Sequence, residues 1–319
     1  MKIAITGANG FVGSTLLRSL HANDYEPIAL VRRPFNAPGV AIREIDYSNF
    51  KHLSAALADV DLVIHNAGKT KTLGQAEMYA ANIGLTQKIV SAINHIDHPI
   101  RLIYISSQAA SGPSKADLPR QESDPCEPIS SYGKSKALAE KVINKQCLQP
   151  YNIVRPCSIY GPQDRDFLQL FKLCKKGLSM QIGRQERPMN MLHVSQLADF
   201  ILSLIENNNV DSETFFASDN VAYTQAQVVQ YIAQAMNIKN SQITVPQVLA
   251  HSAFGLSDLW GKIIRRPLVM NLEKYKEITA EAWLIDSSKA RELLGWNPVP
   301  RMPELIEETY QWYISNGWL

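Results

Sequence analysis

The sequence has little of several features that mark metal-binding, nucleic-acid-binding or membrane-spanning proteins. Only four cysteines occur among 319 residues, and they stand far apart, so we expect reduced, buried thiols and no metal site. The 32 basic and 30 acidic residues nearly cancel and form no long basic run, which argues against nucleic acid as a partner. No apolar run approaches the roughly 18 residues of a membrane span, so we expect no membrane partner.

The remaining composition is that of a folded chain, with 45% hydrophobic and 19% charged residues. The N-terminal "MKIAITGANG" begins directly with a strand and a glycine loop, which leaves no room for a signal peptide. Together with the expected reduced thiols, this predicts a cytoplasmic protein.

Short apolar runs alternate with longer helical patterns in the first half of the chain. The runs "KIAIT", "PIALV", "DLVIHNA", "RLIYISS" and "YNIVRP" read as strands buried on both faces. This pattern predicts an α/β fold, a doubly wound parallel Rossmann sheet with a smaller C-terminal substrate lobe. We assign residues 1–161, with returning segments near 190–218, to the sheet, and residues 162–189 and 219–319 to the lobe. Helices are predicted at about 164–176, 194–207, 224–236 and 302–315.

A glycine-rich turn follows the first predicted strand. "ITGANGFVGSTLL" places Gly7, Gly10 and Gly13 between that strand and the next helix. Glycines there let the backbone approach a pyrophosphate, which the N-terminal amides of the helix then meet. The turn therefore predicts a dinucleotide site.

The end of the second predicted strand indicates which dinucleotide. A chain that prefers NAD would carry an acidic residue there for the ribose hydroxyl, but this one reads Arg32 and Arg33. A guanidinium suits a 2′-phosphate, so we expect NADP, with NAD as the alternative if both arginines are merely solvated. Asp46, after the third apolar segment, could accept from the adenine amine or cap the following helix.

Tyr132 and Lys136 lie four residues apart in "SSYGKSKALAE", which puts both on one helical face. A positive charge about 5 Å from a phenol, at a dielectric near 20, lowers the phenol pKa by roughly two units. The tyrosine could then exchange a proton while hydride moves to or from a nicotinamide. Ser106 and Ser107 end a strand nearby, and Asn82 is a further polar candidate.

Eight segments together resemble the extended short-chain dehydrogenase/reductases, the NAD-dependent epimerase/dehydratase family. They are "TGANGFVG", "HNAG", "NIGLT", "YISSQAASGPS", "SYGKSKALAE", "VRPCSIYGP", "NMLHVSQLAD" and "DSSKARELLGWNP". The resemblance implies Tyr132 as acid/base, Lys136 as its activator and ribose anchor, Ser107 as substrate partner and Asn82 in a proton relay. It implies a cofactor site made of Gly7, Gly10, Phe11, Val12, Gly13, Arg32, Arg33, Asp46, Ala67, Ser106, Tyr132, Lys136 and Pro156. It also implies a homodimer paired through the helices around residues 77–95 and Tyr132.

The family covers several reactions. Dehydratases carry an Asp-Glu pair where this chain has Gln108 and Ala109, so we reject dehydration. A nucleotide-sugar 4-epimerase with bound NAD would hold a diphosphate with an arginine where this chain reads Met189. Arg184, Arg187, Arg265 or Arg266 could substitute, so this alternative stays open.

Reduction of a small carbonyl compound, or oxidation of the alcohol, with NADP(H) fits better. Phe167, Leu168, Phe171, Met189 and Met191 would line an apolar cleft, unless they are simply core. A non-catalytic redox sensor is the weakest alternative, because such proteins usually lack the tyrosine-lysine pair. His193 is expected to anchor the turn before a helix rather than to act in chemistry.

Overall fold

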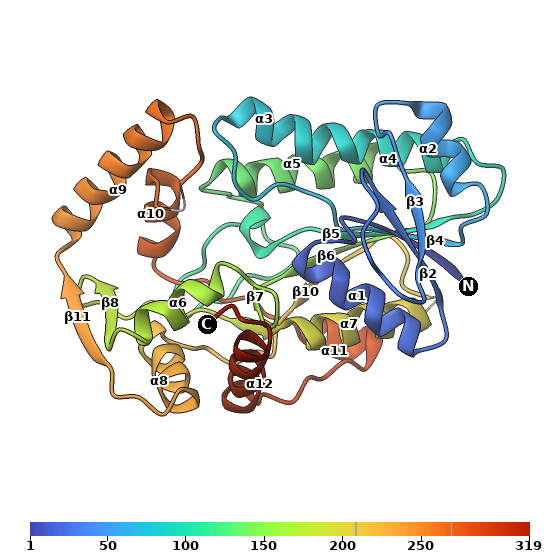
Figure 1. Cartoon of the computed structure of the whole chain (residues 1–319). Coiled ribbons are helices and arrows are strands. Elements are labelled where there is room, and N and C mark those ends of the chain that lie inside the picture. Colours follow the sequence, from blue (N-terminus) through green and yellow to red (C-terminus); the bar gives the residue numbers. More distant parts are fainter. Residues whose placement is uncertain (208, 269) are drawn as a thin grey trace.

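The computed structural model describes residues 1–207, 209–268 and 270–319 (Figure 1). Residues 208 and 269, which fall within the predicted returning segment and lobe, lie outside the described residues. A seven-stranded sheet with the order β10-β6-β5-β4-β1-β2-β3 forms the centre, and every neighbouring pair is parallel. Its strands are β1 (Lys2–Thr6), β2 (Glu26–Val31), β3 (Ala41–Glu44), β4 (Leu62–His65), β5 (Arg101–Ile105), β6 (Tyr151–Pro156) and β10 (Glu213–Ala217).

Helices cover both faces of this sheet, as the alternating pattern predicted (Figure 1). One face carries α1 (Phe11–Ala22), α7 (Val194–Glu206) and α11 (Ser288–Leu294). The other carries α2 (Phe50–Leu57), α3 (Gln75–Tyr79), the π-helical turn η1 (Ala80–Gly84), α4 (Leu85–Asn94) and α5 (Ser131–Gln146). Because both faces are covered, Ile3, Ala4 and Ile5 of β1 are all fully buried. The predicted doubly wound sheet is confirmed.

The C-terminal part adds a second cluster of elements below and beside the sheet. Two small parallel pairs form, β7 (Ser158–Tyr160) with β9 (Met191–His193) and β8 (Leu178–Ile182) with β11 (Ser241–Val245). The helices are α6 (Phe167–Cys174), α8 (Gln225–Ala235), α9 (Gln247–Ile263), α10 (Leu272–Thr279) and α12 (Met302–Ser315). The predicted helices are all found, although α6 is shorter than expected, and α9 and α10 were not predicted.

Two expectations need correction. Ile285, Ala290 and Trp296, assigned to the lobe, pack into the core of the large sheet beside α7. Cys126 is exposed and Cys147 half-buried, so the expectation of buried thiols is right only for Cys157 and Cys174. The exact division into sheet domain and lobe stays a prediction.

Candidate active site

The glycine turn has the geometry that close approach of a phosphate needs. Gly7 has φ +68°, and a Cβ on Gly13 would come within 2.2 Å of the Gly7 carbonyl oxygen. No larger residue fits at either position. Helix α1 starts after Gly10 with no side-chain cap and no acidic residue in its first turn, so its first amides and positive dipole end suit an anion. Phe11 and Val12 form that first turn, half-buried.

A hollow of about 700 Å³ opens beyond the ends of β2 and β3 and brings Arg32 together with Asp46. Its other lining residues are Glu44, Ile45, Tyr47, Ser48, His52 and Lys88. Arg33 is exposed beside the hollow but does not line it. Asp46 accepts hydrogen bonds from the Ser48 amide at 2.8 Å and hydroxyl at 2.6 Å. Asn49, not Asp46, caps the following helix, so the capping alternative for Asp46 is wrong.

Lys88 and His52 are two hollow residues that sequence reasoning missed. Lys88 lies on α4 and His52 on α2, and no motif marked either residue. Lys88 adds a second positive side chain to the lining that holds Arg32, so the hollow mixes cationic side chains with the Glu44 and Asp46 carboxylates.

Tyr132 lies in the first turn of α5, where local sequence fixes the helix start. The Ser130 hydroxyl accepts from the Gly133 amide at 3.2 Å, a standard N-cap. Ser107, at the end of β5, is half-buried next to it. Its hydroxyl oxygen accepts from the Ala109 amide at 3.1 Å, which leaves the hydroxyl proton free to be donated. The structure therefore brings Ser107 and Tyr132 together.

Lys136 is buried on the same face of α5, one turn after Tyr132. Its ammonium donates to the Ile105 carbonyl at 2.6 Å and lies 4.6 Å from the centre of the Tyr104 ring. Burial lowers the pKa of this ammonium to about 8, while the Glu140 carboxylate acts in the opposite direction. A lysine so placed can bind an adjacent hydroxyl and can lose its proton near neutral pH.

The predicted lowering of the tyrosine pKa is not what the structure shows. Burial raises the pKa of the Tyr132 phenol to about 12, the Ser107 hydroxyl lowers it in part, and the Glu277 carboxylate raises it again. Lys136 directs its ammonium toward the Ile105 carbonyl, and desolvation of the phenol is the largest effect on the Tyr132 pKa. The sequence argument placed the two groups on one face correctly but neglected the desolvation.

Ser106 was expected at the cofactor but lies in a buried ion-pair network. Its hydroxyl donates to Glu140 at 2.5 Å, and Glu140 pairs with Arg155 of β6 at 2.6 Å. Both charged side chains are almost fully buried, and Glu140 is one turn beyond Lys136 on the same helical face. The network holds α5 against the sheet and thereby the helical face that carries Tyr132 and Lys136.

Asn82 lies in the π-helical turn η1, an irregularity that is frequent at functional sites. Its side-chain oxygen accepts from the Lys69 amide at 2.7 Å, and its amide group donates to the Lys69 carbonyl at 3.0 Å and the Ser135 hydroxyl at 2.8 Å. Asn82 thus ties the loop after β4 to α5. Ala67 of that loop is held by the Thr6 hydroxyl at 3.0 Å.

His65 carries a role that the sequence did not suggest. Its ring is fully buried between the hydroxyls of Thr6, at 2.8 Å, and Thr86, at 3.0 Å, and Thr86 donates onward to the Asn82 carbonyl. Burial and the charge of Lys136 lower its pKa to about 3, so the ring is neutral. This chain of hydrogen bonds connects the strand of the glycine loop to the Asn82 turn.

Two acidic residues of α10 flank the tyrosine. Glu273 accepts from the Ser131 amide at 3.0 Å and the Ser131 hydroxyl at 2.5 Å, next to Tyr132. Glu277 is one helical turn further on the same face of α10, and its side chain is 20% exposed. Sequence reasoning missed both because it did not predict α10. Glu277 is paired with Lys274 of the same helix at 3.2 Å, so the charges beside Tyr132 are mixed.

The remaining residues named from the sequence lie at the ends of strands and helices. Pro156 is buried at the end of β6, at the same sheet edge as Ile105. His193 caps α7 by accepting from the Ser195 amide, which confirms its predicted anchoring role. Gln108 and Ala109 form a buried 3-10 turn after Ser107.

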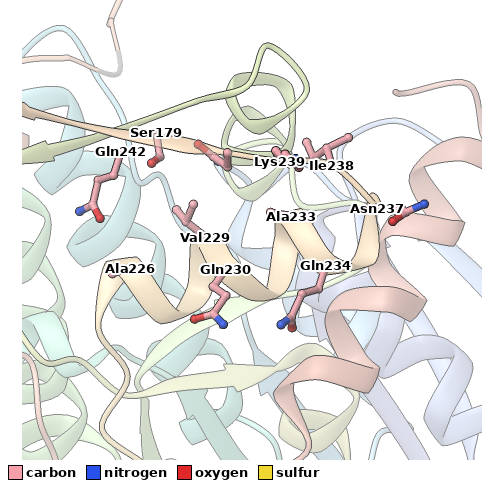
Figure 2. Close-up of a pocket in the computed structure, with 11 residues that line it drawn as sticks. Ser179, Ala226, Val229, Gln230, Ala233, Gln234, Asn237, Ile238, Lys239 and Gln242 are labelled. Carbon is pink, nitrogen blue, oxygen red and sulfur yellow. The ribbon is translucent and has the colours of Figure 1, made fainter.

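The apolar residues expected in the cleft belong to the C-terminal core instead. Phe167, Leu168, Phe171 and Met191 are all at least nine-tenths buried, and Met189 packs against them. A second hollow, of about 640 Å³, lies between α8 and the β8–β11 pair, and Lys239 is its one titratable lining residue (Figure 2). Val229 and Ala233 of α8 face the strands there, while Gln230 and Gln234 point to the opposite side (Figure 2). This hollow holds none of the predicted catalytic residues.

Fold and site together define a dinucleotide-binding α/β enzyme of the short-chain dehydrogenase/reductase type. The chain belongs to the NAD dependent epimerase/dehydratase family, whose model matches residues 3–217. It is 26% identical to a UDP-glucose 4-epimerase of Vibrio cholerae, over 98% of this chain and 96% of the relative. It is 28% identical to a ceramide reductase of Caulobacter vibrioides, over 99% of this chain and 96% of the relative.

A solved structure supports the fold. The UDP-glucuronic acid 4-epimerase of Bacillus cereus, in complex with UDP-glucuronic acid and NAD, superimposes with a TM-score of 0.79 over 99% of this chain and 100% of the other, at 20% identity.

Proposed function

We propose that the protein is an NADP(H)-dependent oxidoreductase that interconverts a carbonyl group and an alcohol at Ser107, Tyr132 and Lys136. NADP(H), when bound, supplies or accepts the hydride. Tyr132 donates the proton to the substrate oxygen or removes it, and Ser107 donates a hydrogen bond to that oxygen. The Lys136 ammonium would bind the cofactor ribose beside these two side chains. The observation that carries this proposal is that Ser107 and Lys136 lie at the carboxyl end of β5, and that the Tyr132 phenol is close enough to Ser107 for the serine hydroxyl to lower its pKa.

The surroundings of the site favour a substrate without phosphate. Met189 replaces the arginine expected for a diphosphate, and its backbone is paired with Tyr223. Arg187 compensates at most in part, because its Nη1 donates to the carbonyls of Ile182 at 2.8 Å and Gln185 at 3.2 Å, while its Nε is buried without a partner in the described residues. The Glu273 carboxylate, which binds Ser131 next to Tyr132, would disfavour a diphosphate close to the tyrosine, whereas Glu277 is paired with Lys274. The similarity to a ceramide reductase supports a ketone or alcohol on an apolar compound.

A nucleotide-sugar 4-epimerase with tightly held NAD is the second candidate. The 26% identity to a UDP-glucose 4-epimerase over nearly the whole of both chains favours it. Arg184, Arg265 and Arg266 are exposed and free of the backbone contacts that hold Arg187. Like the reductase, the epimerase needs Tyr132, so the two candidates differ in cofactor and substrate rather than in the catalytic group.

Further expectations accompany the proposal. We propose a homodimer formed through α4 and α5, a cytoplasmic location, and a relay role for Asn82 in addition to its positioning contacts. The division at residue 161 and the cofactor contacts of Phe11, Val12, Ala67 and Pro156 are proposed with them.

The cofactor choice and the reaction can be tested together. Purified protein is expected to oxidise NADPH when given a long-chain ketone in detergent micelles, and to leave UDP-glucose unchanged. The double variant Arg32→Gln, Arg33→Gln should weaken NADPH binding about tenfold or more, since each charge-assisted pair to a phosphate contributes about 1.5 kcal/mol, and leave NADH binding unchanged. Lys172→Gln, Lys176→Gln, far from the hollow, is the matched control.

Two results would contradict the proposal. One is interconversion of UDP-glucose and UDP-galactose with retained NAD and no net consumption of NADPH, which would establish the epimerase. The other is equal binding of NADPH by the arginine variant and the unaltered protein.

A further inference from the structure

Helix α9 exposes an apolar face that no other element covers. Six large apolar side chains on it are between 57% and 77% exposed: Val248, Leu249, Leu256, Leu259, Trp260 and Ile263. Their spacing at three, four, seven and eight residues places them on one stripe of the helix. A large exposed apolar stripe on a water-facing helix is a mark of an interaction surface.

The opposite face of α9 is already occupied. Ala250, Phe254 and Gly261 are buried there, and the Phe254 ring lies 5.7 Å from the Tyr275 ring of α10. The helix therefore has a small packed face toward the protein and a larger apolar face turned away from it. In Figure 1, α9 forms the outer edge of the molecule, with α10 between it and the rest of the chain.

The charges at the end of this helix indicate what covers the apolar face. Lys262, Arg265 and Arg266 are exposed at its C-terminal end, whereas the helix carries one acidic residue, Asp258, which pairs with Lys262 at 2.9 Å. Trp260, beside them, is of a type enriched where apolar and aqueous phases meet. Within α9 the Lys262 and Asp258 charges cancel, and the net positive charge comes from Arg265 and Arg266 just after its end. An apolar helical face with a tryptophan and a basic end is a composition found in helices that lie in the surface of anionic membranes.

We propose that α9 docks the protein onto the surface of a lipid bilayer that carries anionic headgroups. The six-residue apolar stripe enters the boundary between headgroups and acyl chains, and Lys262, Arg265 and Arg266 contact the headgroup phosphates. The composition excluded a spanning segment, and none of the helices in the described ranges combines the length and apolar content to cross a bilayer. A helix lying on the surface needs only one apolar face.

One helix, α10, lies between the docking helix α9 and the proposed catalytic residue Tyr132. Tyr275 of α10 packs against Phe254, and Glu273 of the same helix binds Ser131, the residue before Tyr132. If the proposed carbonyl reduction holds, the docked protein keeps its site within two helices of a membrane, where an apolar ketone would be concentrated. The docking itself does not depend on that reaction.

The test is sedimentation of the full-length protein with vesicles. We expect binding to vesicles of phosphatidylcholine mixed with phosphatidylglycerol, weaker binding to phosphatidylcholine alone, and loss of the difference at high salt. The variant Leu256→Glu, Leu259→Glu should lower the partition to mixed vesicles at least about tenfold, since each buried methylene contributes about 0.8 kcal/mol. Leu148→Glu, a substitution at an 82% exposed leucine in a loop, should bind as the unaltered protein does.

Three outcomes would overturn the proposal. The first is that the unaltered protein does not sediment with mixed vesicles. The second is that the Leu256→Glu, Leu259→Glu variant, shown to be folded by circular dichroism, sediments equally. The third is a lower molar mass of this variant than of the unaltered protein in light scattering without lipid. That result would make α9 an interface between two copies of the chain. NADPH oxidation measured without vesicles tests the proposed function separately.

Discussion

Replacing Tyr132 by phenylalanine is expected to lower kcat about a thousandfold while NADPH still binds. The substitution removes only the phenolic oxygen that exchanges the substrate proton, and a positioned acid or base typically contributes 10² to 10⁴ in rate, on the order of 3 to 5 kcal/mol. Ser107 and Lys136 keep their own backbone contacts, so the site should remain formed. Stopped-flow absorbance of NADPH and fluorescence titration of the cofactor measure the two effects separately.

Tyr231→Phe is the matched control, because it removes a phenolic oxygen from α8, in the C-terminal core. Its kcat should stay within about twofold of the unaltered value. A Tyr132→Phe protein with undiminished turnover would mean that another group supplies the proton.

Replacing Lys136 by methionine is expected to stabilise the fold while it damages the enzyme. The pKa of Lys136 falls from 10.5 to about 8 because its charge is buried, a shift that corresponds to about 3 kcal/mol of lost stability near pH 7. Methionine avoids that cost but leaves the Ile105 carbonyl one partner short, at about 1 kcal/mol. The free energy of unfolding in urea should therefore rise by about 2 kcal/mol, and kcat should fall at least about a hundredfold.

The free energy of unfolding should also depend on pH in a direction that the lowered pKa of Lys136 fixes. Between about pH 8 and pH 10.5 the unfolded lysine holds its proton while the folded one has lost it, so the unaltered protein gains stability as the pH rises through this range. The advantage of Lys136→Met is complete below pH 8 and should disappear above pH 10.5. Lys134→Met, at an exposed position on the same helix, is the matched control, and its free energy of unfolding at pH 7 should stay within about 0.5 kcal/mol of the unaltered value. If the Lys136→Met protein is less stable than the unaltered one at pH 7, burial of the Lys136 charge does not destabilise the fold.

The large sheet could be predicted because its signals are local. Each buried strand is a short apolar run, and the glycine turn, Ser107, Tyr132 and Lys136 follow strands or start helices at fixed offsets. Since the carboxyl ends of parallel strands share one edge, residues distant in sequence could be expected together.

What could not be predicted depends on packing between distant segments. Ser106 is held by Glu140 and Arg155, so its role follows from a tertiary ion pair that no motif encodes. Helices α9 and α10 were missed because the apolar residues of α9 face outward as well as inward, which blurs the one-sided pattern of a core helix. Because α10 was not predicted, its acidic residues Glu273 and Glu277, which lie near Tyr132, were not predicted as part of the site.

The pKa of Tyr132 was predicted in the wrong direction for a related reason. Spacing on a helix gives the distance between a phenol and an ammonium, but not how much water each loses. In the folded protein burial of the phenol is the largest effect on its pKa, the Glu277 carboxylate raises the pKa further, and the Ser107 hydroxyl lowers it only in part.

Titration of the Tyr132 phenol by ¹³C NMR, with labelled tyrosine and Tyr132→Phe to assign the signal, tests the central claim most directly. Without cofactor the pKa should lie near 12. With saturating NADP⁺ it should fall by at least about one unit, because a nicotinium charge bound next to the phenol would favour the phenolate. A pKa that stays near 12 with NADP⁺ bound would contradict the assignment of Tyr132 as the acid and base of this site.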